Sequence, residues 1–204
     1  MSVRKQKKAA TRQRLEEAAI QIFHEKGLHG CRVSDIVGRA GVAQGTFYNH
    51  FESKEAVFNH IADSYLDHYR RLFLEYSEIL FAGDDLPAII ETMRAFLRQL
   101  LLSCRENIAV AQLVFGEGAG TAGPFYEKSQ IVIGHFVSLI EAVLVRARDR
   151  GLIFMEDPEM SAAMIFGLFQ RCMFYFLLTK EEFDVDKFER GLADFLLNGL
   201  NIRK

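Results

Sequence analysis

The stretch GVAQGTFYNHF, residues 41 to 51, carries many hydrogen-bonding side chains on one short segment. The polar groups are an amide, a hydroxyl, a phenol, a second amide and an imidazole, on Gln44, Thr46, Tyr48, Asn49 and His50. Polar groups are costly to bury without partners, so a core helix would not ordinarily carry this set. They could instead contact DNA, because an amide side chain can pair with adenine, and threonine can meet a phosphate or a thymine methyl. Gly45 would let the backbone approach the groove.

Two short helices are predicted to position this segment. From Val33 to Ala40 apolar residues recur at helical spacing, and Gly41 follows as the usual left-handed cap. Residues 43 to 50 can form the next helix after a tight turn. A helix, a glycine turn and a second helix are the signature of a helix-turn-helix, whose second helix enters the major groove.

The remainder of the chain also favours helices, because only three of its 204 residues are proline and strong helix formers are frequent. Further helices are expected at about 8–26, 54–80, 86–103, 124–150 and 158–179, with a last one from Asp184, so an all-α fold of about nine helices is predicted. Ser53 is expected to cap the helix that begins at Lys54. Phe47 and Phe51 are assigned to the core.

The net charge of −2 combines two opposite halves. Residues 1 to 54 carry ten Lys or Arg against five Asp or Glu, and residues 55 to 204 carry fifteen against twenty-two. The first 14 residues hold six basic side chains and no acid. Such an arm attracts polyanions such as nucleic acid, although a solvated tail would have the same composition.

The cysteines exclude two kinds of site. Cys31, Cys104 and Cys172 are far apart in the sequence and show neither disulfide-framework nor zinc spacing. They suit a reducing cytoplasm, and residues 9 to 26 lack the apolar core of a signal peptide. No metal and no cofactor is predicted, and the expected location is the cytoplasm.

Three stretches follow one another between residues 11 and 60: LEEAAIQIFHEKGLHG, VSDIVGRAGV and AQGTFYNHFESKEAVF. In this order they resemble the tetracycline-repressor (TetR) family of bacterial transcriptional regulators. The resemblance covers about a quarter of the chain. It implies a DNA-binding surface on the second and third helices and at the start of the fourth, made by Arg32, Ser34, Gln44, Gly45, Thr46, Tyr48, Asn49, His50 and Lys54. Tyr48, His50 and Lys54 would mainly hold phosphates.

The sequence departs from the family pattern at two helix starts. Cys31 and Arg32 stand where Thr or Ser is common, and Ala43 replaces a frequent Ser. A lost N-cap costs about 1 kcal/mol, so the third helix would need packing or DNA to order its first turn.

The resemblance also implies two domains. Residues 1–53, with a basic arm at 1–10, would form the helix-turn-helix DNA-binding domain, and residues 54–204 a helical effector-binding and dimerisation domain. The implied function is a ligand-responsive repressor that binds a palindromic operator, although activation stays open. Two other readings also stay open: a DNA-binding protein that senses no effector, and an enzyme.

The C-terminal half offers candidate residues for dimerisation and for effector binding. The helices at about 158–201 carry more apolar surface than one small domain can cover, which predicts a homodimer. Fifteen of the eighteen phenylalanines lie beyond residue 54, as expected for an apolar or amphipathic effector, although core packing explains them equally well. Weak candidates for holding a small-molecule effector are Arg105, His135, Phe166, Gln170 and Arg171.

Two competing patterns need a structural check. The glycine run GEGAGTAG at 116–123 fits the GxGxxG fingerprint of a nucleotide-dependent enzyme, but that fingerprint requires a preceding strand. The segment 161–179 is nearly long and apolar enough to span a bilayer, but Gln170 and Arg171 lie near its middle. A soluble, self-associating helix is the preferred interpretation, with no membrane partner.

Overall fold

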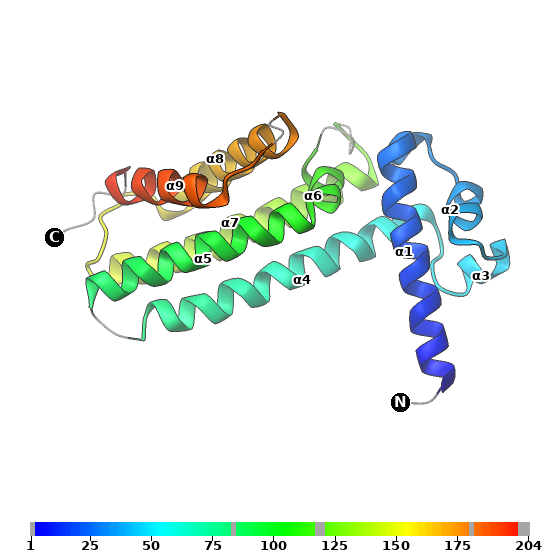
Figure 1. Cartoon of the computed structure of the whole chain (residues 1–204), viewed down its shortest axis with the longest axis horizontal. Helices are drawn as coiled ribbons and strands as arrows, with labels where there is room; N and C mark the ends of the chain where they lie inside the picture. The colour runs from blue at the N-terminus through cyan, green and yellow to red at the C-terminus, as the bar shows by residue number, and fades with distance from the viewer. Residues whose placement is uncertain (1–2, 83–84, 117–120, 180–181, 200–204) are drawn as a thin grey trace. The chain divides into compact units, whose positions relative to one another are not determined.

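The structure, a computed structural model, describes residues 3–82, 85–116, 121–179 and 182–199, and within these ranges it contains nine helices and no strand (Figure 1). In chain order the helices are α1 (Val3–Gly30), α2 (Val33–Ala40), α3 (Gln44–Tyr48), α4 (Lys54–Leu80), α5 (Leu86–Glu106), α6 (Ile108–Phe115), α7 (Pro124–Asp149), α8 (Pro158–Thr179) and α9 (Val185–Gly199). The predicted all-α fold is confirmed.

The Ser53 cap expected from the sequence is present, and aspartates cap two further helices. The Ser53 hydroxyl accepts a hydrogen bond from the Ala56 N–H at 3.2 Å and opens α4. Asp85 accepts from the Ala88 N–H at 3.2 Å before α5. Asp184 accepts from the Lys187 N–H at 2.9 Å before α9. Each carboxylate or hydroxyl satisfies a donor that the first helical turn leaves unpaired.

Helix α1 differs from the prediction at both ends. It begins at Val3, so the described part of the basic arm is helical rather than a loose tail. Gly27 does interrupt the regular helix, with φ of 74° and ψ of 159°, but a further turn continues to Gly30. The early start was missed because an exposed helical segment need not carry an apolar stripe.

The chain forms two compact units. Unit 1 contains residues 1–65 and 109–133, and unit 2 contains residues 66–108 and 134–204. The division differs from the predicted boundary between residues 53 and 54, because the first part of α4 and the segment 109–133 share a core with α1, α2 and α3.

Unit 1 has a core rich in aromatic side chains. The ring of Phe125 packs edge-on against Phe23 and Phe58, with centroid distances of 6.4 and 5.1 Å. Phe47 and Phe51 belong to the same buried cluster, as predicted. This core fixes α2 and α3 on the side of α1.

Unit 2 is a bundle in which α5 and α9 are closely paired. Leu97 of α5 packs with Leu192 and Leu196 of α9. Arg94 donates to the buried carboxylate of Glu189 at 2.9 Å, and Arg98 pairs with Asp186. The carboxylate of Glu189 raises the pKa of Arg94, and this ion pair ties the two helices together.

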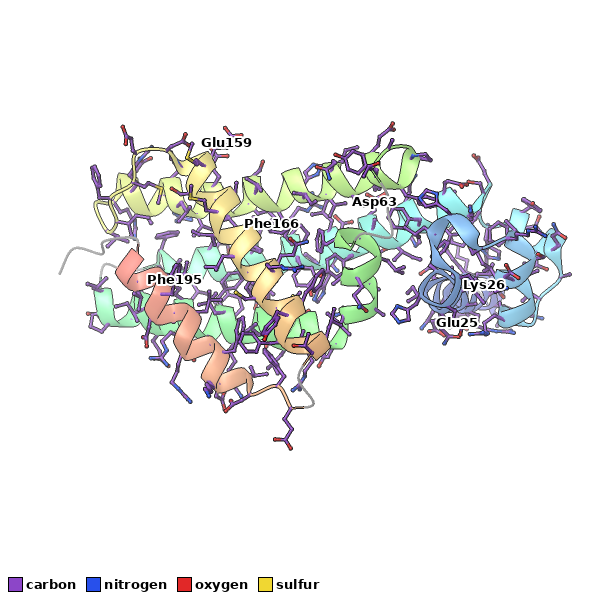
Figure 2. All side chains as sticks on the ribbon, turned by 90° about the horizontal axis from the view of Figure 1, so that it is seen from above. Glu25, Lys26, Asp63, Glu159, Phe166 and Phe195 are labelled. Carbon is purple, nitrogen blue, oxygen red and sulfur yellow. The ribbon has the colours of Figure 1, made fainter. Side chains whose placement is uncertain are left out.

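Helices α7 and α8 are long and apolar enough to cross a bilayer by length and composition alone, and interface or core helices of soluble proteins meet the same criterion. Much of α8 is not covered by its own chain: Met160, Met164, Tyr175 and Leu178 are each more than half exposed. Phe195 of α9 is also exposed (Figure 2). Apolar surface that is left exposed in this way is typical of protein interaction sites.

Candidate nucleic-acid interface

The turn between α2 and α3 has the backbone conformation that the sequence predicts. Gly41 lies in the left-handed region, with φ of 63° and ψ of 41°, and the Val42 N–H donates to the Val37 carbonyl at 3.1 Å. Only glycine adopts this conformation without strain, so the chain can leave α2 and start α3 within two residues. The arrangement is a helix-turn-helix.

Helix α3 is short and is anchored by its aromatic residues. It spans Gln44–Tyr48 rather than the predicted 43–50, and its N-cap, Ala43, makes no side-chain hydrogen bond. Phe47 is fully buried and Phe51 nearly so, with ring centroids 6.0 Å apart. Packing therefore holds a helix whose first turn lacks a capping side chain.

The predicted DNA-contacting residues of α2 and α3 lie largely at the surface of unit 1. Tyr48 is 52% exposed. The exposed set also includes Arg32, Ser34, Gln44, Gly45 and Asn49, while Thr46 and His50 are partly buried. The sequence order alone brings the α3 residues together, and the buried Phe47 turns their polar neighbours outward.

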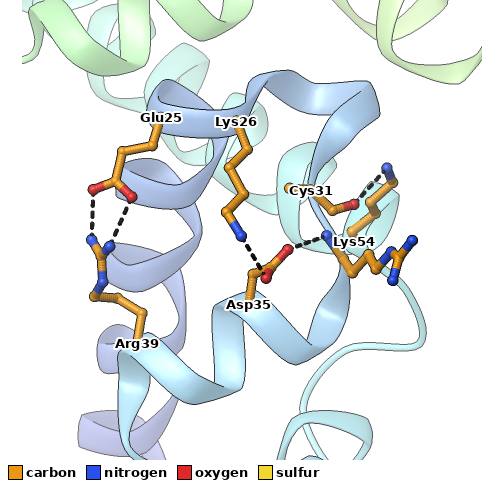
Figure 3. Close-up of polar contacts among 7 residues, drawn as sticks. Glu25, Lys26, Cys31, Asp35, Arg39 and Lys54 are labelled. Carbon is orange, nitrogen blue, oxygen red and sulfur yellow. Dashed lines mark hydrogen bonds and ion pairs between the residues drawn. The ribbon is translucent and has the colours of Figure 1, made fainter.

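The first helix of the motif is fixed to α1 by two ion pairs (Figure 3). Arg39 donates to both carboxylate oxygens of Glu25, at 2.9 and 2.7 Å. Lys26 donates to Asp35 at 2.7 Å, and the same carboxylate accepts from the Arg32 N–H at 2.9 Å. These hydrogen bonds lower the pKa of Glu25 and of Asp35. The pairs orient α2 and place Arg32 at its start.

The structure gives Lys54 a different use from the predicted phosphate contact. Its ammonium donates to the backbone carbonyls of Leu28, His29 and Cys31, at 2.9, 3.1 and 3.1 Å. A lysine ammonium has three donors, so these bonds occupy all of them. The Lys54 side chain therefore ties the start of α4 to the segment that ends α1, and Figure 3 shows it beside Cys31.

One positioning residue was missed by the sequence reasoning. The Arg14 guanidinium donates to the carbonyl of Ala40, the last residue of α2. A cation at a helix C-terminus pairs with carbonyls that the helix leaves unsatisfied. No sequence signal identifies this contact, because its acceptor is a backbone atom 26 residues away.

The weak effector candidates are scattered over unit 2. Arg105, His135 and Arg171 are exposed, so the structure does not place them inside an apolar core. Phe166, which Figure 2 labels on α8, is partly buried, and so is Gln170 of the same helix. The ring of Phe166 stacks on Phe136 of α7 with a centroid distance of 5.8 Å.

The glycine run does not have the context of a dinucleotide site. The apolar run before it is helix α6 rather than a strand. Residues 117–120, which include Gly118 and Gly120, lie outside the described residues. Gly123 has a φ of 89° and directly precedes α7. Without a preceding strand the fingerprint loses its meaning, and the nucleotide-dependent alternative is set aside.

Comparisons with known proteins agree with this geometry. Residues 15–61 match the model of the tetR family of bacterial regulatory proteins. A transcriptional repressor, KstR2 of Rhodococcus jostii, is 32% identical over 105 residues, which are 52% of this chain and 50% of the repressor. The chain thus spans about half the length of this curated relative.

Two solved structures share the fold over nearly the whole chain. A Clostridium perfringens protein described as a candidate fatty acid metabolism regulator has a TM-score of 0.79 and 26% identity, covering 93% of this chain and all of that one. FadR of Bacillus subtilis, solved in complex with stearoyl-CoA, has a TM-score of 0.74 and 17% identity, covering 92% and 98%.

The family and the repressor that this chain matches are transcriptional regulators rather than enzymes, and the helix-turn-helix of the chain fits that class of protein. Within this chain, residues 15–61 carry the domain that defines the tetR family of bacterial regulatory proteins.

Proposed function

We propose that this protein is a repressor that binds a palindromic operator as a homodimer and leaves it when a small apolar or amphipathic effector binds. The observation that carries DNA binding is the surface of α2 and α3, where polar side chains project from a helix anchored by Phe47. Gln44 would read a base edge and Tyr48 would hold a phosphate. The protein would act in the bacterial cytoplasm.

The partner proposed for the uncovered face of α8 is a second copy of the chain. Met160, Met164, Tyr175 and Leu178 are separated by 4, 11 and 3 residues, which places them on one helical face at 3.6 residues per turn. Gly167 lies on the same face and opens onto empty space, so a neighbouring helix could approach closely there. With α9 and its exposed Phe195, two copies would form a four-helix bundle. Part of the predicted interface, residues 180–181 and 200–201, lies outside the described residues.

The proposed effector is a molecule with an acyl chain. Unit 2 contains several aromatic ring contacts, such as Phe73 on Phe96 at 4.8 Å and Tyr69 on Phe136 at 5.6 Å. Side chains of this type suit a hydrocarbon chain. One structural neighbour is by title a fatty acid metabolism regulator, and another, the transcriptional regulator FadR, was solved with stearoyl-CoA. Within the predicted set we retain Phe166 and Gln170, because they are partly buried.

Release from DNA would follow from a change in population. Two recognition helices must lie about 34–36 Å apart to enter successive major grooves. A ligand that binds better to a conformation with another separation lowers the fraction of molecules that fit the operator. Helix α4 would transmit the change, because it begins at the DNA-binding segment and continues into unit 2.

The DNA-binding proposal is tested with variants on a duplex that the wild-type protein has enriched from random sequence. Tyr48→Ala should weaken binding to specific and unrelated duplexes alike, because it removes a phosphate contact, and should leave the salt dependence nearly unchanged, because the phenol carries no charge. Gln44→Ala should instead relax base preference at one position in each half-site, a loss of about 1–3 kcal/mol of discrimination. Wild-type affinity and specificity in both variants would contradict the proposed surface.

The effector proposal is tested by adding stearoyl-CoA, and free stearate for comparison, to the complex with DNA. Release at micromolar ligand, with retained binding of the same ligand by Gln44→Ala, supports sensing in unit 2. If neither ligand binds the protein, the acyl proposal fails, and a DNA-binding protein with no such effector remains.

A further inference from the structure

The N-terminal half of α1 carries a row of basic side chains beside the recognition helix. Lys5, Lys8 and Arg12 follow one another at intervals of three and four residues on a continuous helix. At 3.6 residues per turn they lie within about 60° of one another around the helix axis. Lys5 and Lys8 are exposed, and 44% of the Arg12 side chain is exposed. The row therefore presents three positive charges to solvent on one side of α1.

Contacts at Arg12 show which side of α1 this is. The Arg12 guanidinium lies over the ring of Phe51, with its central carbon 5.1 Å from the ring centroid. Its Nε donates to Glu16 at 3.2 Å, and the same carboxylate oxygen lies 2.9 Å from Nε2 of His60 on α4. Phe51 comes three residues after the end of α3. Glu16 thus holds Arg12 against the segment that leaves the recognition helix.

Two residues of the same row affect the pKa of the His50 imidazole. Burial is the main cause that lowers its pKa, and the charges of Lys8 and Arg12 lower it further, while Glu16 opposes them. The charges of Lys8 and Arg12 therefore lie near the residues that follow α3, in agreement with the contact of Arg12 with Phe51. In Figure 1, α1 continues past α3 toward the N-terminus, so the basic row extends beyond the helix-turn-helix itself.

We infer that Lys5, Lys8 and Arg12 form a second DNA contact, which holds phosphates outside the major groove that α3 enters. This inference rests on the proposed DNA binding and extends its footprint. From Lys5 to Arg12 the helix rises about 10 Å, and one strand of B-DNA carries a phosphate every 3.4 Å of helix axis, so the row matches about three phosphates. The row carries charge only, and it would raise affinity without reading sequence.

The alternative is that the row is a solvated helix face with no contact. The two cases predict different salt dependence of DNA binding, because each phosphate contact releases bound counterions and a solvated face releases none. Removing two contacts should lower the slope of log affinity against log salt by about 1.8 for each bound protomer. Between 50 and 200 mM salt, the wild-type protein should then lose about 12-fold more affinity per protomer than the variant.

The test uses the full chain and the variant Lys5→Ala/Lys8→Ala, which leaves Arg12 and its bonds to Glu16 in place. The matched control is Lys7→Ala, which removes one charge from the same segment at a position about 100° or more away around the helix. Affinity is measured against salt on an enriched duplex with long flanks and on the same duplex trimmed to the two half-sites. We expect trimming to weaken the wild-type protein and Lys7→Ala but not the double variant.

Three outcomes separate the claims. A lower slope for the double variant with an unchanged half-site preference supports the second contact. A slope and affinity equal to those of the wild-type protein overturn it, and so does an equal loss per charge in Lys7→Ala, because the face would then be irrelevant. Absence of selective binding by the wild-type protein itself would refute the proposed function rather than this extension of it.

Discussion

The three hydrogen bonds of Lys54 lead to a prediction that separates a structural role from a DNA contact. Lys54→Met keeps much of the side-chain length and removes the ammonium. The carbonyls of Leu28, His29 and Cys31 would lose their donor, at sites that are partly buried for the first and last. If the ammonium only held phosphates, the same substitution would leave the unfolding transition unchanged.

The magnitude follows from the geometry. A hydrogen bond that involves a charged group contributes about 1.5–3 kcal/mol, but three bonds from one partly exposed ammonium are not additive. We therefore expect a loss of about 2–4 kcal/mol in the free energy of unfolding. For a chain of this size, each kcal/mol shifts the melting temperature by about 2–4 °C, so the transition should move down by roughly 4–16 °C.

The assay is thermal unfolding followed by far-UV circular dichroism, with the midpoint of urea unfolding as a second measure. Lys7→Met is the control, because it makes the same chemical change at an exposed position of α1. The free energy of unfolding of Lys7→Met should stay within about 0.5 kcal/mol of the wild-type value. A Lys54→Met protein as stable as Lys7→Met, but impaired in DNA binding, would refute the structural role and restore the phosphate contact.

Three further predictions concern the cap of α3, the ion pairs of α2 and the face of α8. Ala43→Ser should stabilise the protein by about 1 kcal/mol in urea unfolding, because the new hydroxyl can accept from a backbone N–H of the first turn of α3, which has no side-chain cap; Ala43→Val, which offers no acceptor, should show no gain. The pKa of Glu25 is lowered in the folded state, so its contribution to stability is present above about pH 4.3 and is lost as the pH falls below it. The urea midpoints of the wild-type protein and Glu25→Gln should accordingly differ at pH 7 and converge as the pH falls through the lowered pKa of Glu25, and a constant difference would argue against the pairing with Arg39. Met164→Lys should convert a dimer to a monomer in sedimentation at micromolar concentration, because it places a charge on the apolar face of α8, and an unchanged dimer would exclude this face as the interface.

The sequence was informative wherever a local residue determines a local conformation. Gly41 marked the turn because its left-handed backbone favours glycine, and Ser53 marked the start of α4 because its hydroxyl caps the helix. Phe47 could be assigned to the core because it is apolar within a polar segment. The surface of the helix-turn-helix was therefore predictable in outline.

Sequence patterns were uninformative where backbone acceptors or packing between distant segments determine the contacts of a side chain. The acceptors of Lys54 and Arg14 are carbonyl oxygens, which every residue carries and no sequence pattern marks. The placing of Phe125 in the core of unit 1 depends on tertiary packing between segments about 100 residues apart. Contacts of this kind set the division into two units and the role of Lys54, so both needed the structure.

The central claim is that the surface of α2 and α3 reads DNA in a two-fold symmetric complex. The most direct measurement is repeated selection of random duplexes by the full-length protein, followed by sequencing of the bound DNA. We predict one enriched palindrome whose half-site centres lie about 10 base pairs, or a multiple of one helical turn, apart, and no enrichment by Gln44→Ala/Tyr48→Ala. Recovery of unenriched random sequence by the wild-type protein would contradict the account.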